Sequence, residues 1–304
     1  MSRFLLRGSI VPLPTPFSAG AIDWDAFFRL VERAWTGGSH GIAVGGSTGE
    51  PWSLSLVERE ELIRQAVAAA GNAPVLAGTG CWTLEETVTL TRKAQELGAT
   101  AALVWIPPGS KANPSGLYSY FSRLAEAVGG FPLVLYNVPG RTGAAFSPEV
   151  VQRLAECHAN VVGIKHSSED LGAVSRFLAI RQGEFAVFCG LEALTLPMMA
   201  LGAVGTVAAT ANWLPREVAE LCEAALQGDW ERARSLHLAL SEANEAIFWD
   251  TNPVPLKTVL GWMGVCQAEW RPPLGPTTPE IAARLATMAR RYGLLDHEKS
   301  ALLG

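Results

Sequence analysis

Residues 75–105 read VLAGTGCWTLEETVTLTRKAQELGATAALVW, and this stretch decides the fold. Two short apolar runs, residues 75–78 and 101–105, have the length and composition of buried strands. Between them, residues 84–97 place apolar side chains at the spacing of an amphipathic helix. A strand, a helix and a second strand in this order predict parallel pairing, because the helix carries the chain back along the sheet.

The same unit repeats along the chain. Eight short β-rich runs are each followed by a helical pattern, and they cover residues 9–11, 41–44, 75–78, 101–105, 133–137, 161–165, 185–189 and 205–208. Eight such units predict an α/β fold, the (β/α)8 TIM barrel, over residues 1–226. Helical patterns at 230–248 and 281–292 predict a C-terminal helical extension over residues 227–304. An open doubly wound sheet is the weaker interpretation, because no Gly-x-Gly-x-x-Gly follows the first run.

The composition of the chain indicates whether it binds a nucleic acid or a membrane. Of the 304 residues, 49% are hydrophobic and 17% are charged, and the net charge of −5 offers no basic surface to a nucleic acid. One uncharged stretch, residues 193–215, is long enough to raise the question of a membrane span. Pro197, Gly202 and Gly205 interrupt it, so we predict a short helix followed by a short strand and expect no membrane partner.

The positions of the cysteines and histidines bear on the cellular compartment of the protein and on whether it has a metal site. The five cysteines form no CxxC pair and the N-terminus has no signal-peptide pattern, so we expect reduced thiols and a cytoplasmic location. The five histidines form no HxxxH or His/Cys cluster. We therefore expect no metal site.

A barrel of this kind carries its chemistry at the carboxyl ends of its strands. Lys165 ends the sixth run, and by strand alternation it shares a face with Gly163, which leaves space beside it. Burial there favours the neutral amine, the form that attacks a carbonyl to make a Schiff base. A lysine at a strand end is more often simply solvated, so Lys165 alone does not decide the function.

Two other strand ends carry polar groups. The second run leads into Gly45-Gly-Ser-Thr-Gly-Glu50, where backbone N–H groups and the hydroxyls of Ser47 and Thr48 can hold a small carboxylate. Such glycine-rich turns are also common without a ligand. Tyr136, near the end of the fifth run, can pass protons, and Arg141 in the next loop can pair with a carboxylate. Each of these two residues can also have a purely structural role.

Three motifs in this order resemble those of the dihydrodipicolinate synthase and N-acetylneuraminate lyase family: Gly46-Ser-Thr-Gly-Glu50, Tyr136-Asn-Val-Pro139 and Gly163-Ile-Lys165. The resemblance runs from about Gly8 to the C-terminal helices. It implies that Lys165 forms a Schiff base with pyruvate, that Tyr136 and Thr48 move protons, and that no cofactor is needed. The substrate-binding residues that it implies are Ser47, Thr48, Gly49, Arg141 and Val207.

Within this family, the stretch Tyr136-Asn-Val-Pro-Gly-Arg141 is most similar to the synthase branch, whose arginine binds the carboxylate of aspartate semialdehyde. The resemblance then implies small-molecule 2-oxo acid and aldehyde substrates and a homotetramer built as a dimer of dimers. An aldolase or dehydratase of a 2-keto-3-deoxy sugar acid is the alternative. A catalytically silent barrel that serves as a binding protein is the third interpretation, because a fold alone does not prove activity.

One position departs from the family pattern. The family carries a second tyrosine after the fourth strand, where this chain has Gly109 within Ile106-Pro-Pro-Gly-Ser110. In synthases that phenol reaches across the dimer interface and completes the proton relay. If the chain is a synthase, another hydroxyl or an ordered water must replace this phenol, and Ser110 and Ser47 are the nearby candidates in the sequence.

Overall fold

A closed barrel of eight parallel strands forms the centre of the molecule, which confirms the predicted fold class. The computed structural model describes residues 6–180 and 184–295. β1 closes the ring, because Ile10 pairs with Val207 on one side and with Gly41 on the other. In barrel order the strands are β1 (Gly8–Pro12), β10 (Gly205–Val207), β9 (Ala186–Cys189), β8 (Val161–His166), β7 (Leu133–Asn137), β6 (Ala101–Trp105), β5 (Val75–Gly78) and β4 (Gly41–Val44).

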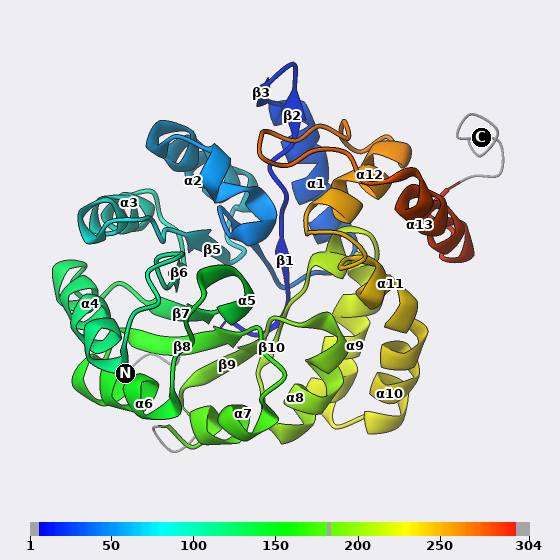
Figure 1. Ribbon diagram of the computed structural model, residues 1–304. Coiled ribbons are helices and arrows are strands. Elements are labelled where there is room, and N and C mark those ends of the chain that lie inside the picture. The colour runs from blue at the N-terminus through cyan, green and yellow to red at the C-terminus, as the bar shows by residue number, and fades with distance from the viewer. Residues whose placement is uncertain (1–5, 181–183, 296–304) are drawn as a thin grey trace.

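Helices surround the strands, as Figure 1 shows. All eight predicted runs form barrel strands. The uncharged stretch 193–215 forms α8 and β10 as predicted, and within the described ranges no helix is both long and apolar enough to cross a bilayer. The covering helices are α1 (Trp24–Thr36), α2 (Leu56–Ala70), α3 (Leu84–Glu96), α4 (Pro114–Ala127), α6 (Pro148–Cys157), α7 (Leu171–Leu178), α8 (Thr195–Leu201) and α9 (Pro215–Gln227).

The start of α2 illustrates how local sequence sets an element. Ser55 accepts a hydrogen bond from the backbone N–H of Glu58, and the Glu58 carboxylate accepts one from the backbone N–H of Ser55 at 2.8 Å. This reciprocal capping box satisfies N–H groups that have no partner within the helix. It therefore fixes where the loop after β4 ends, and that loop carries the predicted hydroxyl motif.

Alternate residues of each strand point into the barrel, where Ile10, Leu103 and Phe188 belong to an inner apolar cluster. Strand register places polar and aromatic side chains at the same level. Trp105 pairs with Tyr136, Tyr136 with Lys165, and Lys165 with Phe188. Two of the predicted catalytic residues therefore lie side by side on the inner face.

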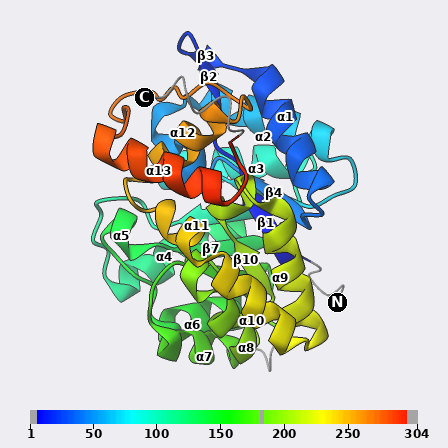
Figure 2. The ribbon, with the colours of Figure 1, turned by 90° about the vertical axis from the view of Figure 1, so that its right-hand side faces the viewer.

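The C-terminal part differs in detail from the prediction. The single helix predicted over 230–248 is wrong, because the chain forms α10 (Trp230–Ala239) and α11 (Ser241–Ala246) with a break at Leu240. α13 (Pro279–Arg291) matches a predicted helix, whereas α12 (Val254–Trp262) and the hairpin β2 (Phe17–Ser18) and β3 (Ala21–Ile22) were not predicted. Figures 1 and 2 show α12 in orange and α13 in red, and the orange segment that joins them runs beside the blue hairpin. The boundary at residues 226 and 227 stays a prediction.

Candidate active site

A cavity of about 470 Å³ opens at the carboxyl ends of the barrel strands. A second cavity, of about 530 Å³, lies between α1 and the start of α9 and contains none of the predicted residues. Across residues 6–180 and 184–295, no group of three or more His, Cys, Asp or Glu side chains is placed to hold a metal ion. The predicted residues that line the first cavity are Ser47, Thr48, Tyr136, Arg141, Lys165 and Val207.

Lys165 lies near the end of β8 and is only 5% exposed. Its Nζ atom is 4.3 Å from the centre of the Tyr136 ring. The space for its stem comes from Gly190, because a Cβ atom there would lie 2.8 Å from Cε of Lys165. Gly163, which we expected to leave this space, instead permits close strand packing, since a Cβ there would lie 2.5 Å from the Ala186 carbonyl oxygen.

Tyr136 brings a phenol into the cavity from the end of β7. Its Oη atom is 3.0 Å from Oγ of Ser47. Burial alone would raise the pKa of the phenol, but the charge of Lys165, the bond with Ser47 and the charge of Arg141 outweigh it and lower the pKa. A phenol whose pKa is lowered in this direction gives up its proton more readily, which suits it to proton transfer.

The two neighbouring hydroxyls of the loop after β4 face different partners. Ser47 contacts the phenol, whereas Oγ1 of Thr48 accepts a hydrogen bond from Nδ2 of Asn252 at 3.0 Å. Both residues line the cavity and lie in the 3-10 turn Ser47–Gly49. The structure therefore places Ser47, rather than Thr48, beside Tyr136, which corrects the expected pairing of Thr48 with the phenol.

Arg141 lies in α5 (Pro139–Thr142), directly after β7. Its Nη2 atom donates to the backbone carbonyl of Asn252 at 2.6 Å, and its guanidinium lies 5.4 Å from the centre of the Trp52 ring. Burial lowers the pKa of Arg141, against the opposing effect of Tyr136. Asn252 thus touches both Thr48 and Arg141. The sequence analysis did not predict Asn252 as a site residue.

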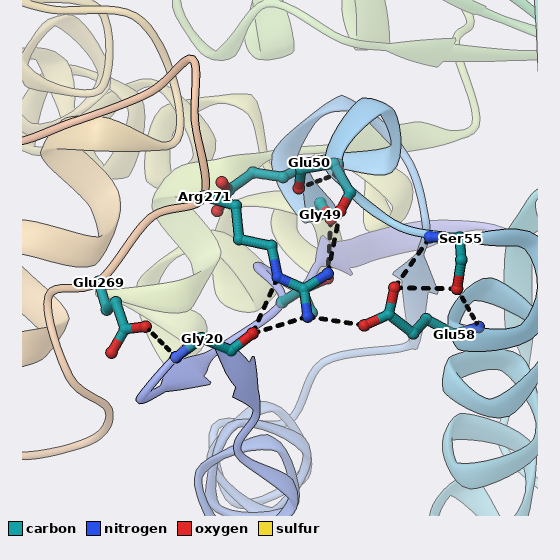
Figure 3. Close-up of polar contacts among 9 residues, drawn as sticks. Gly20, Gly49, Glu50, Ser55, Glu58, Glu269 and Arg271 are labelled. Carbon is teal, nitrogen blue, oxygen red and sulfur yellow. Dashed lines mark hydrogen bonds and ion pairs between the residues drawn. The ribbon is translucent and has the colours of Figure 1, made fainter.

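Gly49 does not line the cavity, in contrast to the prediction for it. Its carbonyl accepts a hydrogen bond from Oγ1 of Thr15 at 2.7 Å. The next residue, Glu50, has a left-handed backbone with φ of 53°, which a residue with a side chain rarely adopts. Its carboxylate pairs with Nζ of Lys257 at 2.6 Å, and both side chains are completely buried. These contacts stabilise the loop that carries Ser47 and Thr48, which we call the hydroxyl loop. Figure 3 shows Arg271 beside this loop.

Gly109 lies in the loop after β6 and is exposed. Its backbone N–H donates to the carbonyl of Thr142 at 3.0 Å, and its φ is 77°. Neither Gly109 nor Ser110 lines the cavity. Of the two hydroxyls considered as replacements for the family tyrosine, only Ser47 lies at the phenol of Tyr136.

Comparisons with known proteins identify relatives of this chain. A protein from Thermus thermophilus, named 4-hydroxy-tetrahydrodipicolinate synthase, is 59% identical over 98% of this chain and 100% of its own. A protein of the same name from Aquifex aeolicus is 40% identical over 95% of this chain and 99% of its own.

Solved structures give the same result. The crystal structure of dihydrodipicolinate synthase from Aquifex aeolicus superposes with a TM-score of 0.93 at 40% identity, covering 95% of this chain and 99% of that one. The enzyme from Thermotoga maritima superposes with a TM-score of 0.92 at 32% identity, covering 96% and 100%. The model of the dihydrodipicolinate synthetase family matches residues 5–291. The chain therefore belongs to the dihydrodipicolinate synthetase family.

Proposed function

We propose that this protein is a 4-hydroxy-tetrahydrodipicolinate synthase, which condenses pyruvate with aspartate semialdehyde through a Schiff base at Lys165. The observation that carries the proposal is the convergence of the Lys165 amine on the Tyr136 phenol, which in turn contacts Ser47, in one cavity. The names of the relatives support the same reaction. The alternative reaction on a 2-keto-3-deoxy sugar acid receives no support from those relatives.

The first half of the reaction makes an iminium ion. The neutral amine of Lys165 attacks C2 of pyruvate, and the carbinolamine then loses its hydroxyl as water. Tyr136 transfers protons in these steps, and Ser47 takes the adjoining place in the relay that we first expected for Thr48. Thr48 and the backbone N–H groups of its loop hold the pyruvate carboxylate, and Val207 forms part of the cavity wall.

The second half uses the iminium ion as an electron sink. Loss of a proton from the pyruvate methyl group gives an enamine, whose carbon adds to the aldehyde of the second substrate. Arg141 binds the carboxylate of aspartate semialdehyde, because a guanidinium matches a carboxylate in two parallel hydrogen bonds. The amino group of the adduct then displaces the lysine and closes the ring of the product.

Borohydride trapping tests the proposal. Reduction in the presence of pyruvate should add one covalent mass at Lys165, located by peptide mass spectrometry, because only an imine at that amine is reducible. Lys257 is an internal control: its amine is fully buried in an ion pair and should remain unmodified. An unlabelled Lys165 would overturn the mechanism and would favour the third interpretation, a catalytically silent barrel that serves as a binding protein.

A substrate panel read out by product mass tests the second substrate. We expect a condensation product from pyruvate and aspartate semialdehyde, and no cleavage of 2-keto-3-deoxy sugar acids. If Lys165 is trapped and a sugar acid is cleaved, Schiff-base formation at Lys165 would stand but the synthase reaction would be rejected.

We further propose a cytoplasmic homotetramer, in which residues 1–226 are the catalytic barrel and residues 227–304 the extension. Leu56, Val57 and Trp82 support self-association, since they are 39%, 78% and 52% exposed in the single chain. Light scattering coupled to size exclusion should give a mass near four times 32.4 kDa. A mass of one chain at micromolar concentration would reject the tetramer.

A further inference from the structure

Glu192 lines the reaction cavity but belongs to none of the motifs that predicted the site. It begins the 3-10 turn Glu192–Leu194 after β9 and is 3% exposed. Its Oε1 atom accepts a hydrogen bond from the backbone N–H of Ala209 at 2.6 Å. Its Oε2 atom is buried and has no hydrogen-bond partner among the residues that the structure describes. One oxygen therefore anchors the carboxyl, and the other is unpaired.

Lys165 is the positive charge that acts on this carboxyl. The stem of Lys165 passes against Gly190, two residues before Glu192. Burial raises the pKa of the Cys189 thiol to about 12, so that this neighbour is neutral. The titratable groups that line the cavity with Glu192 are Lys165 on β8, Tyr136 on β7, Arg141 on α5 and Asp250 before α12, and Cys189 on β9 lies beside Glu192.

An isolated carboxylate is costly to bury, and a protonated carboxyl is much less so. Burial raises the pKa of Glu192, and the nearby backbone N–H groups and the charge of Lys165 offset only part of this rise. The proton must reside on Oε2, because Oε1 already accepts a hydrogen bond from Ala209. The pKa of Glu192 therefore lies above its ordinary value, and a positive charge at Lys165 acts to lower it.

We propose that Glu192 is the charge-compensating residue of the Schiff base: it holds a proton on Oε2 while the amine of Lys165 is neutral and becomes the carboxylate that balances the iminium ion. This inference rests on the proposed function, since it requires an iminium ion at Lys165. It assigns to Glu192 a task that the lysine, the phenol and the hydroxyls do not perform.

The proton balance of the step is closed within the cavity. A neutral amine, a ketone and a carboxylic acid become an iminium ion, a carboxylate and one water. The new bond joins Nζ of Lys165 to C2 of pyruvate, and the bond that breaks joins C2 to its oxygen. That oxygen leaves as water, with two protons from the amine, the acid and the hydroxyls that relay between them, while one proton stays on nitrogen. No net charge is created in the low-dielectric cavity, which keeps the step favourable.

Glu192→Gln separates this charge role from a purely structural one. The amide oxygen can still accept the hydrogen bond from Ala209, so a structural role predicts behaviour like the wild type. The charge role predicts that half-maximal borohydride trapping needs about tenfold more pyruvate, because the cation has lost its counter-charge. It also predicts that the alkaline limit of trapping moves to lower pH, because an iminium ion without a counter-charge loses its proton more readily.

Glu192→Asp is the matched control. It keeps the charge but shortens the side chain, so its alkaline limit should stay near that of the wild type even if its thermal stability falls. Equal pyruvate dependence and equal pH limits in wild type and Glu192→Gln would overturn the proposal.

A measurement on the wild type covers the case in which a variant fails to fold. The infrared difference spectrum on adding pyruvate should show loss of a protonated-carboxyl band. A wild type that traps pyruvate at Lys165 without any carboxyl change overturns only the role of Glu192. A wild type that traps nothing overturns the proposed function, and this inference with it.

Discussion

At the scale of single residues, the 3.0 Å contact between Ser47 and Tyr136 separates the tasks of two adjacent hydroxyls. Tyr136→Phe should lower kcat about 10²-fold or more, and Ser47→Ala about tenfold, because each removes part of a proton relay. Thr48→Val should instead raise the KM for pyruvate with a smaller effect on kcat, since its hydroxyl faces Asn252 and not the phenol. Steady-state kinetics of the three variants would show this split, and an equal loss of kcat in Ser47→Ala and Thr48→Val would contradict it.

Arg141 gives a second prediction at this scale. Arg141→Ala should raise the KM for aspartate semialdehyde about 10- to 100-fold, as expected for loss of a charge-assisted hydrogen bond. Arg141→Lys keeps the charge but loses the planar fork, so it should recover only part of the affinity. The trapping of pyruvate serves as the internal control and should change little in either variant. A comparable loss for both substrates would assign Arg141 to the first half-reaction or to folding.

The sequence predicted some of these residues and not others, for physical reasons. Lys165 and Tyr136 lie on strands, where alternation and the strand end together determine what faces the cavity. The order of Ser47 and Thr48 was not predictable, because they lie in a 3-10 turn that has no period of two. Asn252 reaches Thr48 across 204 residues of chain, and Glu192 is anchored by Ala209. No local pattern marks such long-range contacts.

At the scale of elements, α12 supports the hydroxyl loop through one buried ion pair. Burial raises the pKa of Glu50 and lowers that of Lys257, and their mutual attraction opposes both shifts. Lys257→Met should cost about 3–5 kcal/mol in the free energy of unfolding, because Glu50 is left buried without its partner. It should also raise the KM for pyruvate, since Thr48 lies two residues before Glu50. Urea unfolding and steady-state kinetics measure the two effects.

The double variant Glu50→Gln/Lys257→Met is the control for this prediction. It removes both charges, so it should be more stable than Lys257→Met by a coupling term that a double-mutant cycle measures. Additive losses would show that the two charges act independently. If Lys257→Met lowered the free energy of unfolding by less than about 1 kcal/mol, the ion pair would not be important for stability.

The same element shows where sequence patterns are weakest. The eight strands were predicted because each is a local apolar run bounded by turn residues. α12 is short and carries Pro255 in its first turn. The missing N–H of a proline does not destabilise a helix at this position, but in the sequence a proline suggests a loop. The hairpin β2–β3 has two residues in each strand, and its contacts to the C-terminal segment stabilise it. Tertiary contacts of this kind leave no periodicity in the sequence.

At the scale of the whole molecule, Arg271 joins the C-terminal part of the chain to the hairpin and to residues 53–58, which precede it by more than 200 residues (Figure 3). Its guanidinium donates to the carbonyl of Gly20 in the hairpin at 2.8 Å and to the carbonyl of Ser53 after the hydroxyl loop at 2.9 Å. It also pairs with Glu58 at the start of α2 at 2.6 Å. The C-terminal segment thus ties the N-terminal hairpin and α2 to the loop that carries Ser47.

This junction predicts a specific dependence of stability on pH. The hydrogen bond from Arg271, with those from Ser55, lowers the pKa of Glu58 to about 2, against the effect of burial. Because the folded-state pKa lies below the unfolded value of about 4.3, the contribution is complete above that value and is lost as the pH falls toward 2. Glu58→Gln should therefore cost about 1 kcal/mol at neutral pH, the size expected for a partly exposed pair, and the difference should vanish near pH 2.

Two features make Glu58→Gln a clean test in urea unfolding experiments. Glutamine can also complete the capping box with Ser55, so the substitution removes the charge while the helix start is kept. Glu60→Gln, in the exposed pair with Arg64 on the same helix, is the matched control and should cost less than about 0.5 kcal/mol. If the cost of Glu58→Gln stayed constant down to about pH 2, it would have to come from the cap, because a protonated Glu58 can no longer form the ion pair with Arg271.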